Sequence, residues 1–206
     1  PSVTVVVPVH DERFLVGDAL ERVLAAEPEG IERLDVIVVD DGSTDGSAQI
    51  IADIAARHPD RVRCLAHGRR RGKGAALRTG IEAASGDVIV FQDADLEYDP
   101  RDYASLLRPL WEDGADAVYG SRFQPSGRRR ALHFRLSIAN RLLTFVSNLF
   151  TNLNLTDLTG GLKAFRAPLL KSIPLRSDGF AVDAELVAKL SKRAARVFEV
   201  PVSYLG

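Results

Sequence analysis

The sequence predicts an α/β fold, in which helices pack on both faces of a mostly parallel sheet. Short apolar runs rich in valine and isoleucine alternate with stretches in which apolar residues recur at helical spacing. That alternation is typical of parallel strands joined by crossover helices. Polar clusters follow three of the apolar runs, and the carboxyl ends of such strands are where open α/β sheets bind their ligands. The pattern therefore predicts both the fold and the edge of the sheet that holds the site.

Each element of the first 120 residues is predicted from its own pattern. The β-branched run at residues 3–9 indicates a buried strand, and residues 14–24 repeat apolar side chains at helical spacing. Four more strands are indicated by the apolar runs at residues 34–39, 61–66, 88–92 and 115–119. Helical patterns lie between them, at residues 50–54, 77–81 and 99–112. Ser43 or Thr44 can cap the first of these helices, and Asp99 the last.

The pattern changes in the second part of the chain. A basic run at residues 128–130 is followed by a long helical pattern at residues 132–153, with its apolar side chains on one face. Strands at residues 162–165 and 197–204, with a helix at residues 184–191 between them, complete the predicted sheet. A chain of 206 residues with this organisation is expected to be a single domain.

Composition excludes several classes of protein. The 27 Lys and Arg residues balance 28 Asp and Glu residues, and a net charge of -1 argues against general nucleic-acid binding. A single cysteine, Cys64, excludes an internal disulfide framework and a multi-cysteine metal site. No run of about 18 apolar residues is present to span a bilayer. The chain starts at Pro1 and ends in a predicted strand, a pattern compatible with a fragment truncated at its C-terminus.

Three carboxylates at alternate positions, Asp93, Asp95 and Glu97, follow the strand predicted at residues 88–92. Alternate residues of an extended chain face the same side, so these acids are expected to converge. Carboxylate oxygens suit Mg2+ or Mn2+, which typically bridge the phosphates of a substrate. The alternative interpretation is a solvated acidic turn that leads into the next helix.

Two further polar clusters indicate a nucleotide. Helix capping would need only one of Asp40 and Asp41, so the other can accept a hydrogen bond from the N–H of a nucleobase. Glu12 can similarly hold a base or a ribose hydroxyl. Lys73, in the glycine-rich loop at residues 68–74, either reaches the nucleotide or is a solvated lysine at the start of a helix. With the metal, these residues predict a nucleoside-diphosphate pocket.

Spacing argues against two other nucleotide-binding classes. A dinucleotide-binding turn needs glycines after the first strand, where this chain has Val9, His10, Asp11 and Glu12. The loop at residues 68–74 lacks the glycine spacing of a P-loop, and Gly74 stands where a Ser or Thr would bind Mg2+.

At these positions the chain resembles the family 2 glycosyltransferases, which have the GT-A fold. The resemblance is carried by residues 7–12, 38–43 and 72–76 and by Asp93-Ala94-Asp95, in the order and spacing of the family. His10 and Asp11 depart from the family's pattern in the first of these segments.

The resemblance implies a nucleotide-sugar donor and a division of labour along the chain. Residues 1–120 would form the nucleotide-binding half, and residues 121–206 the acceptor half. Seven residues are placed at the nucleotide: Pro8, Val9, Glu12, Asp41, Lys73, Asp93 and Ala94.

Motifs in the second half resemble the polyprenyl-phosphate subgroup, the dolichyl- or undecaprenyl-phosphate mannosyl- and glucosyltransferases. These motifs lie at residues 120–122, 154–157, 163–166 and 199–202. In this subgroup the residue two past the second Asp of the metal motif also binds the metal; it is often Gln and is Glu97 here. Arg122 and Arg135 fall where the subgroup binds the acceptor phosphate. The alternatives are a structural salt bridge for Arg122 and an exposed place on an amphipathic helix for Arg135.

A phosphate acceptor changes what catalysis requires. A phosphate monoester has a second pKa of about 6, so near neutral pH it needs positioning and charge balance more than deprotonation. We expect direct displacement with inversion at the sugar carbon. Asp95 would hold the metal that stabilises the leaving diphosphate, and Arg122 would orient the acceptor. Asp157 is expected to organise the site loop, and Glu185 to hold a sugar hydroxyl.

Two alternative functions stay open. A family 2 enzyme that glycosylates a sugar or polysaccharide hydroxyl would need a general base, for which Asp157 and Glu185 are the candidates. A catalytically silent domain would bind the nucleotide sugar without turnover.

A lipid acceptor implies a place at the cytoplasmic face of a membrane, with the protein peripheral or anchored by a segment outside this chain. The helix at residues 132–153 would lie at the membrane interface, and the basic run at residues 128–130 would face anionic headgroups. The same helix could instead pack in the core or form the contact of a homo-oligomer.

Overall fold

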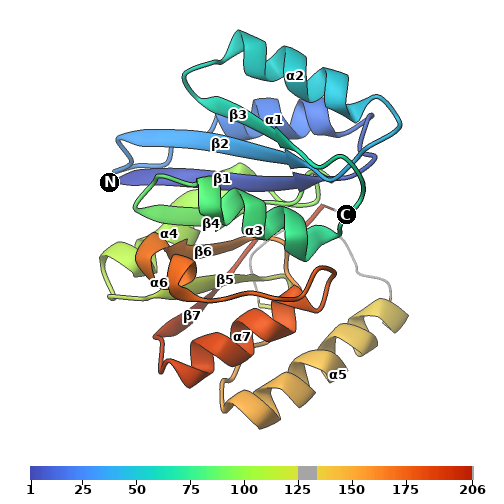
Figure 1. Cartoon of the computed structure of the whole chain (residues 1–206). Coiled ribbons are helices and arrows are strands. Elements are labelled where there is room, and N and C mark those ends of the chain that lie inside the picture. Colours follow the sequence, from blue (N-terminus) through green and yellow to red (C-terminus); the bar gives the residue numbers. More distant parts are fainter. Residues whose placement is uncertain (125–133, 206) are drawn as a thin grey trace.

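The computed structural model describes residues 1–124 and 134–205. A seven-stranded sheet lies at its centre, in the order β3-β2-β1-β4-β6-β5-β7 (Figure 1). The strands are β1 (Ser2–Val9), β2 (Arg33–Asp40), β3 (Val62–Ala66), β4 (Val88–Phe91), β5 (Ala117–Ser121), β6 (Lys163–Arg166) and β7 (Val197–Pro201). β6 runs antiparallel to β4 and β5, and the other neighbouring strands are parallel. The predicted mostly parallel α/β sheet is therefore confirmed.

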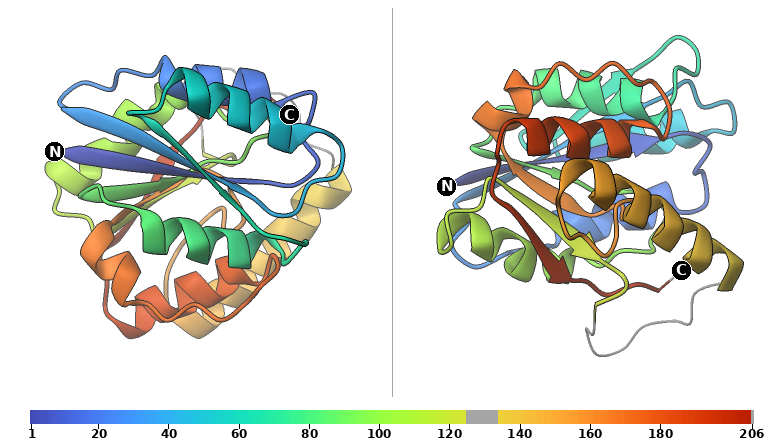
Figure 2. Two further views of the ribbon diagram at one scale, coloured as in Figure 1. Left: turned by 45° about the horizontal axis from the view of Figure 1, so that its top comes forward. Right: turned by 90° about the horizontal axis from the view of Figure 1, so that it is seen from below.

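Helices cover both faces of the sheet (Figure 2). One face carries α1 (Val16–Leu24), α2 (Ser47–Arg57) and α4 (Tyr103–Trp111), the last preceded by the 3-10 turn η1 (Pro100–Asp102). The other face carries α3 (Lys73–Ala83), α6 (Ala167–Ser172) and α7 (Val182–Lys192). In β1, Val5 and Val7 belong to the first apolar layer and Val6 to the second, as the alternation of side chains along a strand requires.

α5 (Phe134–Thr151) lies outside both layers, alongside α7 (Figure 1). Its large apolar side chains are exposed; Leu142, Leu149 and Phe150 are 61%, 70% and 84% exposed. Its inward stripe is polar, and the buried side chain of this helix is Thr144. The alternative that this helix packs its apolar face in the core is therefore wrong. No helix among the described residues is long and apolar enough to cross a membrane.

The polar stripe of α5 holds the loop that follows the helix. The Asn148 side chain donates to the carbonyl of Leu155 (2.7 Å) and accepts from its N–H (3.2 Å), and the Thr144 hydroxyl accepts from the N–H of Leu158 (3.2 Å). Asp157 lies within this loop, so α5 helps to position it. The predicted basic run at residues 128–130, and the predicted start of the helix at residue 132, lie outside the described residues.

Two local predictions were wrong. α2 begins at Ser47, after Gly46 in the left-handed region (φ 101°), rather than under a cap from Ser43 or Thr44. The Asp45 carboxylate instead accepts from the N–H of Ser47 (2.9 Å). The expectation that residues 93–97 continue in extended chain also fails, because β4 ends at Phe91 and Leu96 has a φ of 62°.

Candidate active site

The carboxyl ends of β1, β2 and β4 open into a cleft of about 440 Å3. The cleft is lined by all seven residues that were predicted to bind the nucleotide, and by Asp95. Six further residues complete its lining: His10, Arg70, Gly72, Ala76, Gly179 and Phe180. The structure therefore brings together, at one edge of the sheet, residues that lie as much as 172 positions apart, from Pro8 to Phe180.

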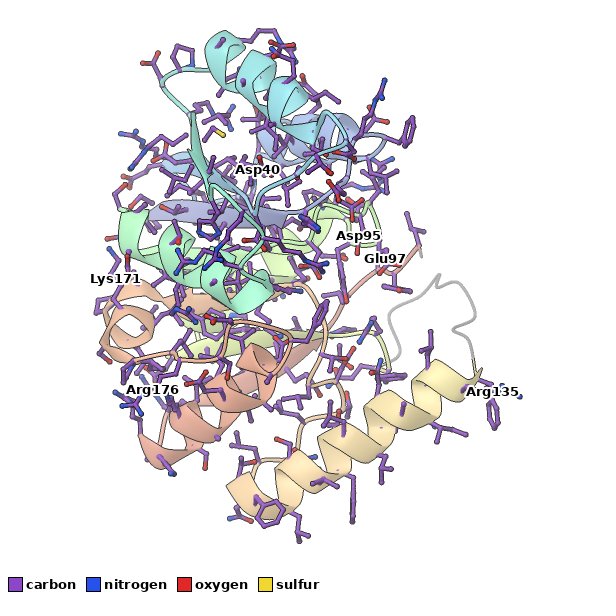
Figure 3. The ribbon with its side chains drawn as sticks, turned by 45° about the vertical axis from the view of Figure 1, so that its right-hand side comes forward. Asp40, Asp95, Glu97, Arg135, Lys171 and Arg176 are labelled. Atoms are coloured by element: carbon purple, nitrogen blue, oxygen red, sulfur yellow. The ribbon has the colours of Figure 1, made fainter. Side chains whose placement is uncertain are left out.

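Asp41 lines the cleft beside the glycine-rich loop at residues 68–74, which is called the basic loop below. Its carboxylate is buried and accepts from His67 Nδ1 (2.6 Å) and from the backbone N–H groups of Arg71 (2.8 Å) and Gly72 (2.6 Å). Burial alone would raise the pKa of Asp41, but these hydrogen bonds hold it below its ordinary value. Asp41 therefore fixes the basic loop to the end of β2. The neighbouring Asp40, which is labelled in Figure 3, accepts from the N–H of Ser43 (3.0 Å).

Glu12 adds negative charge at the mouth of the same cleft. Its backbone N–H donates to the hydroxyl of Ser47 (2.9 Å), which anchors the turn after β1 to the start of α2. Burial, and then the charges of Asp45 and Asp93, raise the pKa of its carboxyl group. Glu12 is thus part of a wider acidic region that extends to the loop after β4.

The three carboxylates predicted to bind a metal have different partners. Asp93 pairs with Lys73, whose Nζ lies 2.7 Å and 2.8 Å from its two oxygens. Asp95 accepts from the N–H of Glu97 (3.1 Å), and Glu97 accepts from the hydroxyl of Tyr204 (2.7 Å). Across residues 1–124 and 134–205, no three His, Cys, Asp or Glu side chains are grouped in a geometry that could hold a metal ion. The bend at Leu96 explains why simple alternation does not make them converge.

The chemistry of these residues nevertheless suits a divalent cation. Burial, and then the charge of Asp93, raise the pKa of Asp95 to about 7. The pKa of a carboxyl group rises in this way when the group is buried and the negative charge near it exceeds the positive charge. A hard cation at Asp95 would relieve that repulsion, and carboxylate oxygens are its preferred ligands. Figure 3 shows Asp95 and Glu97 in the same loop after β4, where the Asp95 carboxylate accepts from the N–H of Glu97.

Arg122 lies beyond Glu97, in a buried ion pair with Asp157. Its Nε and one terminal nitrogen donate to the two oxygens of Asp157 (2.7 Å and 2.9 Å), and the same terminal nitrogen donates to the Thr159 hydroxyl (2.9 Å). Asp157 has no exposed surface. Arg122 also lies over the ring of Tyr204, 5.4 Å from its centroid. Tyr204 therefore contacts both the predicted phosphate-binding arginine and the predicted metal ligand Glu97.

The other predicted site residues lie apart from this constellation. Arg135 is exposed in the first turn of α5, and Figure 3 shows it pointing into solvent, away from Asp95 and Glu97. Glu185 accepts from the N–H groups of Arg176 (2.8 Å) and Ser177 (2.7 Å) and pairs with Lys189.

These contacts do not favour a general base at either predicted position. Burial alone would raise the pKa of Glu185, but Lys189 and the amides of the preceding loop lower it to about 2. Both oxygens of Asp157 are occupied by Arg122. A carboxylate whose pKa is lowered in this way, or whose two oxygens both bind a guanidinium group, is a poor proton acceptor near neutral pH.

Sequence reasoning missed three features of the site. Phe180 lines the cleft and is 76% exposed, but no sequence motif indicated that it belongs to the site. Tyr204 reaches Glu97 across 107 positions of sequence. Lys163 and Asp183 form a buried ion pair, which joins β6 to α7. The only sequence signal for the ion pair was a charged residue within or beside an apolar segment, and such a signal does not identify the partner residue.

Comparison with known proteins identifies relatives of the whole chain. The sequence model of glycosyl transferase family 2 matches residues 4–173. A polyprenol monophosphomannose synthase from Mycolicibacterium smegmatis is 29% identical over 206 residues, a match that covers 97% of this chain and 76% of the relative. An undecaprenyl-phosphate mannosyltransferase from Micrococcus luteus is 30% identical over 214 residues, covering 98% of this chain and 83% of the relative.

The fold also matches solved structures. A mannosyltransferase from Pyrobaculum calidifontis, in complex with GDP-Man and Mn2+, superposes with a TM-score of 0.70 at 26% sequence identity. The match covers 99% of this chain and 56% of the mannosyltransferase chain. The predicted GT-A architecture is confirmed by this agreement between sheet order, family match and superposition.

Proposed function

Because the chain belongs to glycosyltransferase family 2, we propose that it transfers a hexose from a nucleotide sugar to the phosphate of a polyprenyl phosphate. The nucleotide lies in the cleft at the ends of β1, β2 and β4, and its diphosphate lies over Asp93 and Asp95. The acceptor phosphate approaches from the side of Arg122. The phosphate oxygen attacks the anomeric carbon, the bond to the nucleoside diphosphate breaks, and the configuration inverts.

The observation that carries this proposal is that both candidate bases are engaged in ion pairs. Asp157 is paired with Arg122, and Glu185 with Lys189. A sugar hydroxyl would need one of them to accept a proton, whereas a phosphate acceptor is already anionic. Two relatives that match nearly the whole chain are named for polyprenol and undecaprenyl phosphate products or acceptors, which supports the same choice.

The metal belongs to the same proposal. Asp95, with Asp93 and Glu97, would hold Mg2+ or Mn2+, which supplies charge stabilisation for the departing diphosphate. The Mn2+ bound with GDP-Man in the Pyrobaculum calidifontis mannosyltransferase supports this choice. Arg122 would orient the acceptor phosphate. Its two hydrogen bonds to Asp157 fix the plane of its guanidinium group.

The membrane surface is the third part of the proposal. α5 presents apolar side chains outward, and the charges it carries, Arg135 and Arg141, are both positive. An apolar surface with basic residues suits the interface of an anionic membrane. We therefore place the protein at the cytoplasmic face of a membrane, where the lipid acceptor is found. Pairing of α5 with a second copy in a homo-oligomer is the competing interpretation.

A donor panel tests the reaction. Radiolabelled UDP-glucose, GDP-mannose and related nucleotide sugars are incubated with an undecaprenyl or dolichyl phosphate and Mn2+, and product is extracted into organic solvent. Label in the organic phase with one donor supports the proposal, and Asp95→Asn should abolish it. Label that appears only in a water-soluble product, and appears there equally when the polyprenyl phosphate is left out, would instead identify a hydroxyl acceptor. Nucleotide binding without any turnover would identify a silent binding domain.

A further inference from the structure

Lys73 occupies the position that a cation would take beside Asp93. Its Nζ lies 2.7 Å and 2.8 Å from the two carboxylate oxygens, so it neutralises Asp93 from the cleft side. The Lys73 side chain is only 18% exposed. In this arrangement Asp93 cannot offer the same oxygens to a metal ion. The pair therefore sets Asp93 apart from Asp95 and Glu97, which accept from the N–H of Glu97 and the hydroxyl of Tyr204.

The backbone on either side of Lys73 packs closely against residues 177–178. A Cβ atom on Gly72 would lie 2.4 Å from the carbonyl oxygen of Asp178, and one on Gly74 would lie 2.1 Å from that of Ser177. The N–H of Ala75 also donates to Asp178 (3.2 Å). These close contacts hold the start of α3 against residues 177–178. Any movement of the charge must come from rotation of the four-carbon side chain within the cleft.

The cation of Lys73 has more than one anionic neighbour. It pairs with Asp93, and the charge of Asp183 also acts on it. Asp183 is already paired with Lys163, so it attracts Lys73 without offering it a complete ion pair. A phosphate oxygen in the cleft would be a stronger alternative partner for the same ammonium group.

We propose that Lys73 is an exchangeable counter-ion, which neutralises Asp93 in the free protein and moves to the diphosphate when a divalent cation takes its place. This inference rests on the proposed function, because it needs a nucleoside diphosphate and a metal in the cleft. The nucleotide gives Lys73 a new partner and frees Asp93 for the metal. Nucleotide and metal must therefore each increase the affinity of the protein for the other by the same factor.

The test measures Mn2+ binding from the EPR signal of the free ion, with and without GDP or UDP. In the wild-type protein we expect weak binding of Mn2+ alone and an increase of about tenfold with nucleotide, within the usual range of coupling. Lys73→Met should bind Mn2+ alone at least threefold more tightly than wild type. Its nucleotide effect should shrink to about twofold or less. Loss of a residue that helps to bind the metal would weaken Mn2+ binding, so an increase in Mn2+ affinity distinguishes a counter-ion from such a residue.

Two variants control for charge and folding. Lys73→Arg keeps the charge and should keep most of the coupling. Lys192→Met removes the same charge from an exposed position on α7 and should change neither Mn2+ affinity nor coupling. Lys73→Gln repeats the main test if the Met variant is unstable.

The outcomes separate this inference from the proposed function. If Lys73→Met binds Mn2+ no more tightly than wild type, or retains the wild-type coupling, the counter-ion exchange is overturned while the metal site stands. If wild-type protein binds no Mn2+ even with nucleotide, the proposed metal site falls, and the exchange falls with it.

Discussion

Arg122 is a buried cation whose charge is matched by Asp157, and that pairing decides what its loss would do. A buried ion pair contributes little compared with an apolar pair, but removing one partner leaves an uncompensated charge. Arg122→Ala should therefore lower the free energy of unfolding by about 3–5 kcal/mol, measured by urea denaturation. Arg122→Lys keeps the charge but loses the two-pronged geometry, and should retain more stability than the Ala variant while raising the acceptor KM.

The double variant Arg122→Leu with Asp157→Leu controls for the loss of charge. Because both charges are absent, it should be closer to wild type in stability than either single variant, although inactive. A single Arg122→Ala variant as stable as wild type would contradict the idea that this arginine is a buried partner of Asp157.

Glu185 provides a prediction for pH. Its pKa is lowered to about 2 in the folded protein from an ordinary value of 4.5, so between these values the unfolded chain binds more protons. The stabilising effect of the carboxylate is complete above about pH 4.5 and is lost as the pH falls toward 2. Glu185→Gln should lower the free energy of unfolding by about 1–3 kcal/mol at pH 7, with the difference shrinking below pH 4.

The same variant tests the hydroxyl-acceptor function. Urea denaturation at several pH values gives the stability, and the donor panel gives the activity. Glu185→Gln should keep turnover with a polyprenyl phosphate, because no proton has to be accepted by this residue. A variant that binds the donor normally but transfers no sugar would favour Glu185 as a base.

At the residue level, sequence reasoning found the cleft better than the contacts within it. Pro8, Glu12 and Asp93 follow strands whose carboxyl ends must share one edge of a parallel sheet, so their convergence follows from the strand pattern. The partner of Glu97 does not follow from any local pattern, because Tyr204 reaches it only through the tertiary fold. The paired state of Lys73 was similarly undetermined, since a lysine at a helix start has no fixed direction.

At the scale of elements, α5 reverses the usual orientation of an amphipathic helix. A surface helix normally turns its apolar stripe to the core. Here polar side chains such as Thr144 and Asn148 bind the protein, while Leu142, Leu149 and Phe150 face outward. An exposed apolar surface of this extent is typical of an interaction site.

Vesicle flotation tests the interaction that we propose for α5. Replacing Leu142, Leu149 and Phe150 together by Ser removes apolar area that is already exposed in the folded protein. The variant should therefore keep its thermal stability within a few degrees, while binding to vesicles that contain phosphatidylglycerol falls at least tenfold. Neutral phosphatidylcholine vesicles should bind wild-type protein more weakly, because Arg135 and Arg141 then lose their anionic partners.

The competing occupant of α5 gives a different result. If α5 pairs with a second copy, wild-type protein should be dimeric in light scattering without vesicles, and the triple Ser variant should be a monomer. A wild-type monomer that stays in solution during flotation would contradict both interpretations of the exposed surface.

The elements themselves illustrate which parts of a fold are encoded locally. Strands such as β1 and β2 are marked by β-branched runs, and the sequence predicted both. The insertion of β6 between β4 and β5, antiparallel to each, is set by pairing across the sheet and leaves no local signal. The periodicity of α5 predicted a helix, but periodicity alone does not say whether its apolar face turns inward or outward.

At the scale of the whole molecule, the two predicted halves of the chain share one sheet and meet again at the site. β4 of the first half pairs with β6 of the second. The end of the chain then returns to the acidic loop, where Tyr98 and Tyr204 form an isolated bridge and the N–H of Leu205 donates to the carbonyl of Glu97 (3.0 Å). The two halves therefore share one hydrogen-bonded sheet and both contribute to the loop after β4.

Tyr204 joins the proposed metal and acceptor sides, and its two contacts can be separated. Its hydroxyl donates to Glu97, and burial and then this hydrogen bond raise its pKa to about 12, so it remains a donor at neutral pH. Its ring lies against Arg122 (5.4 Å) and Tyr98 (5.5 Å). Tyr204→Phe removes only the first contact, whereas Tyr204→Leu removes the hydroxyl and the aromatic ring.

The two variants should therefore affect different measurements. Tyr204→Phe leaves Glu97 without its orienting donor and should weaken Mn2+ binding in the presence of nucleotide about tenfold, the lower end of the usual effect of such outer contacts. Its acceptor KM should stay near wild type because Arg122 keeps its ring. Tyr204→Leu should weaken Mn2+ binding equally and also raise the acceptor KM. Equal effects of both variants on both quantities would mean that Tyr204 only supports the fold, and a Mn2+ affinity unchanged in Tyr204→Phe would remove Glu97 from the metal site.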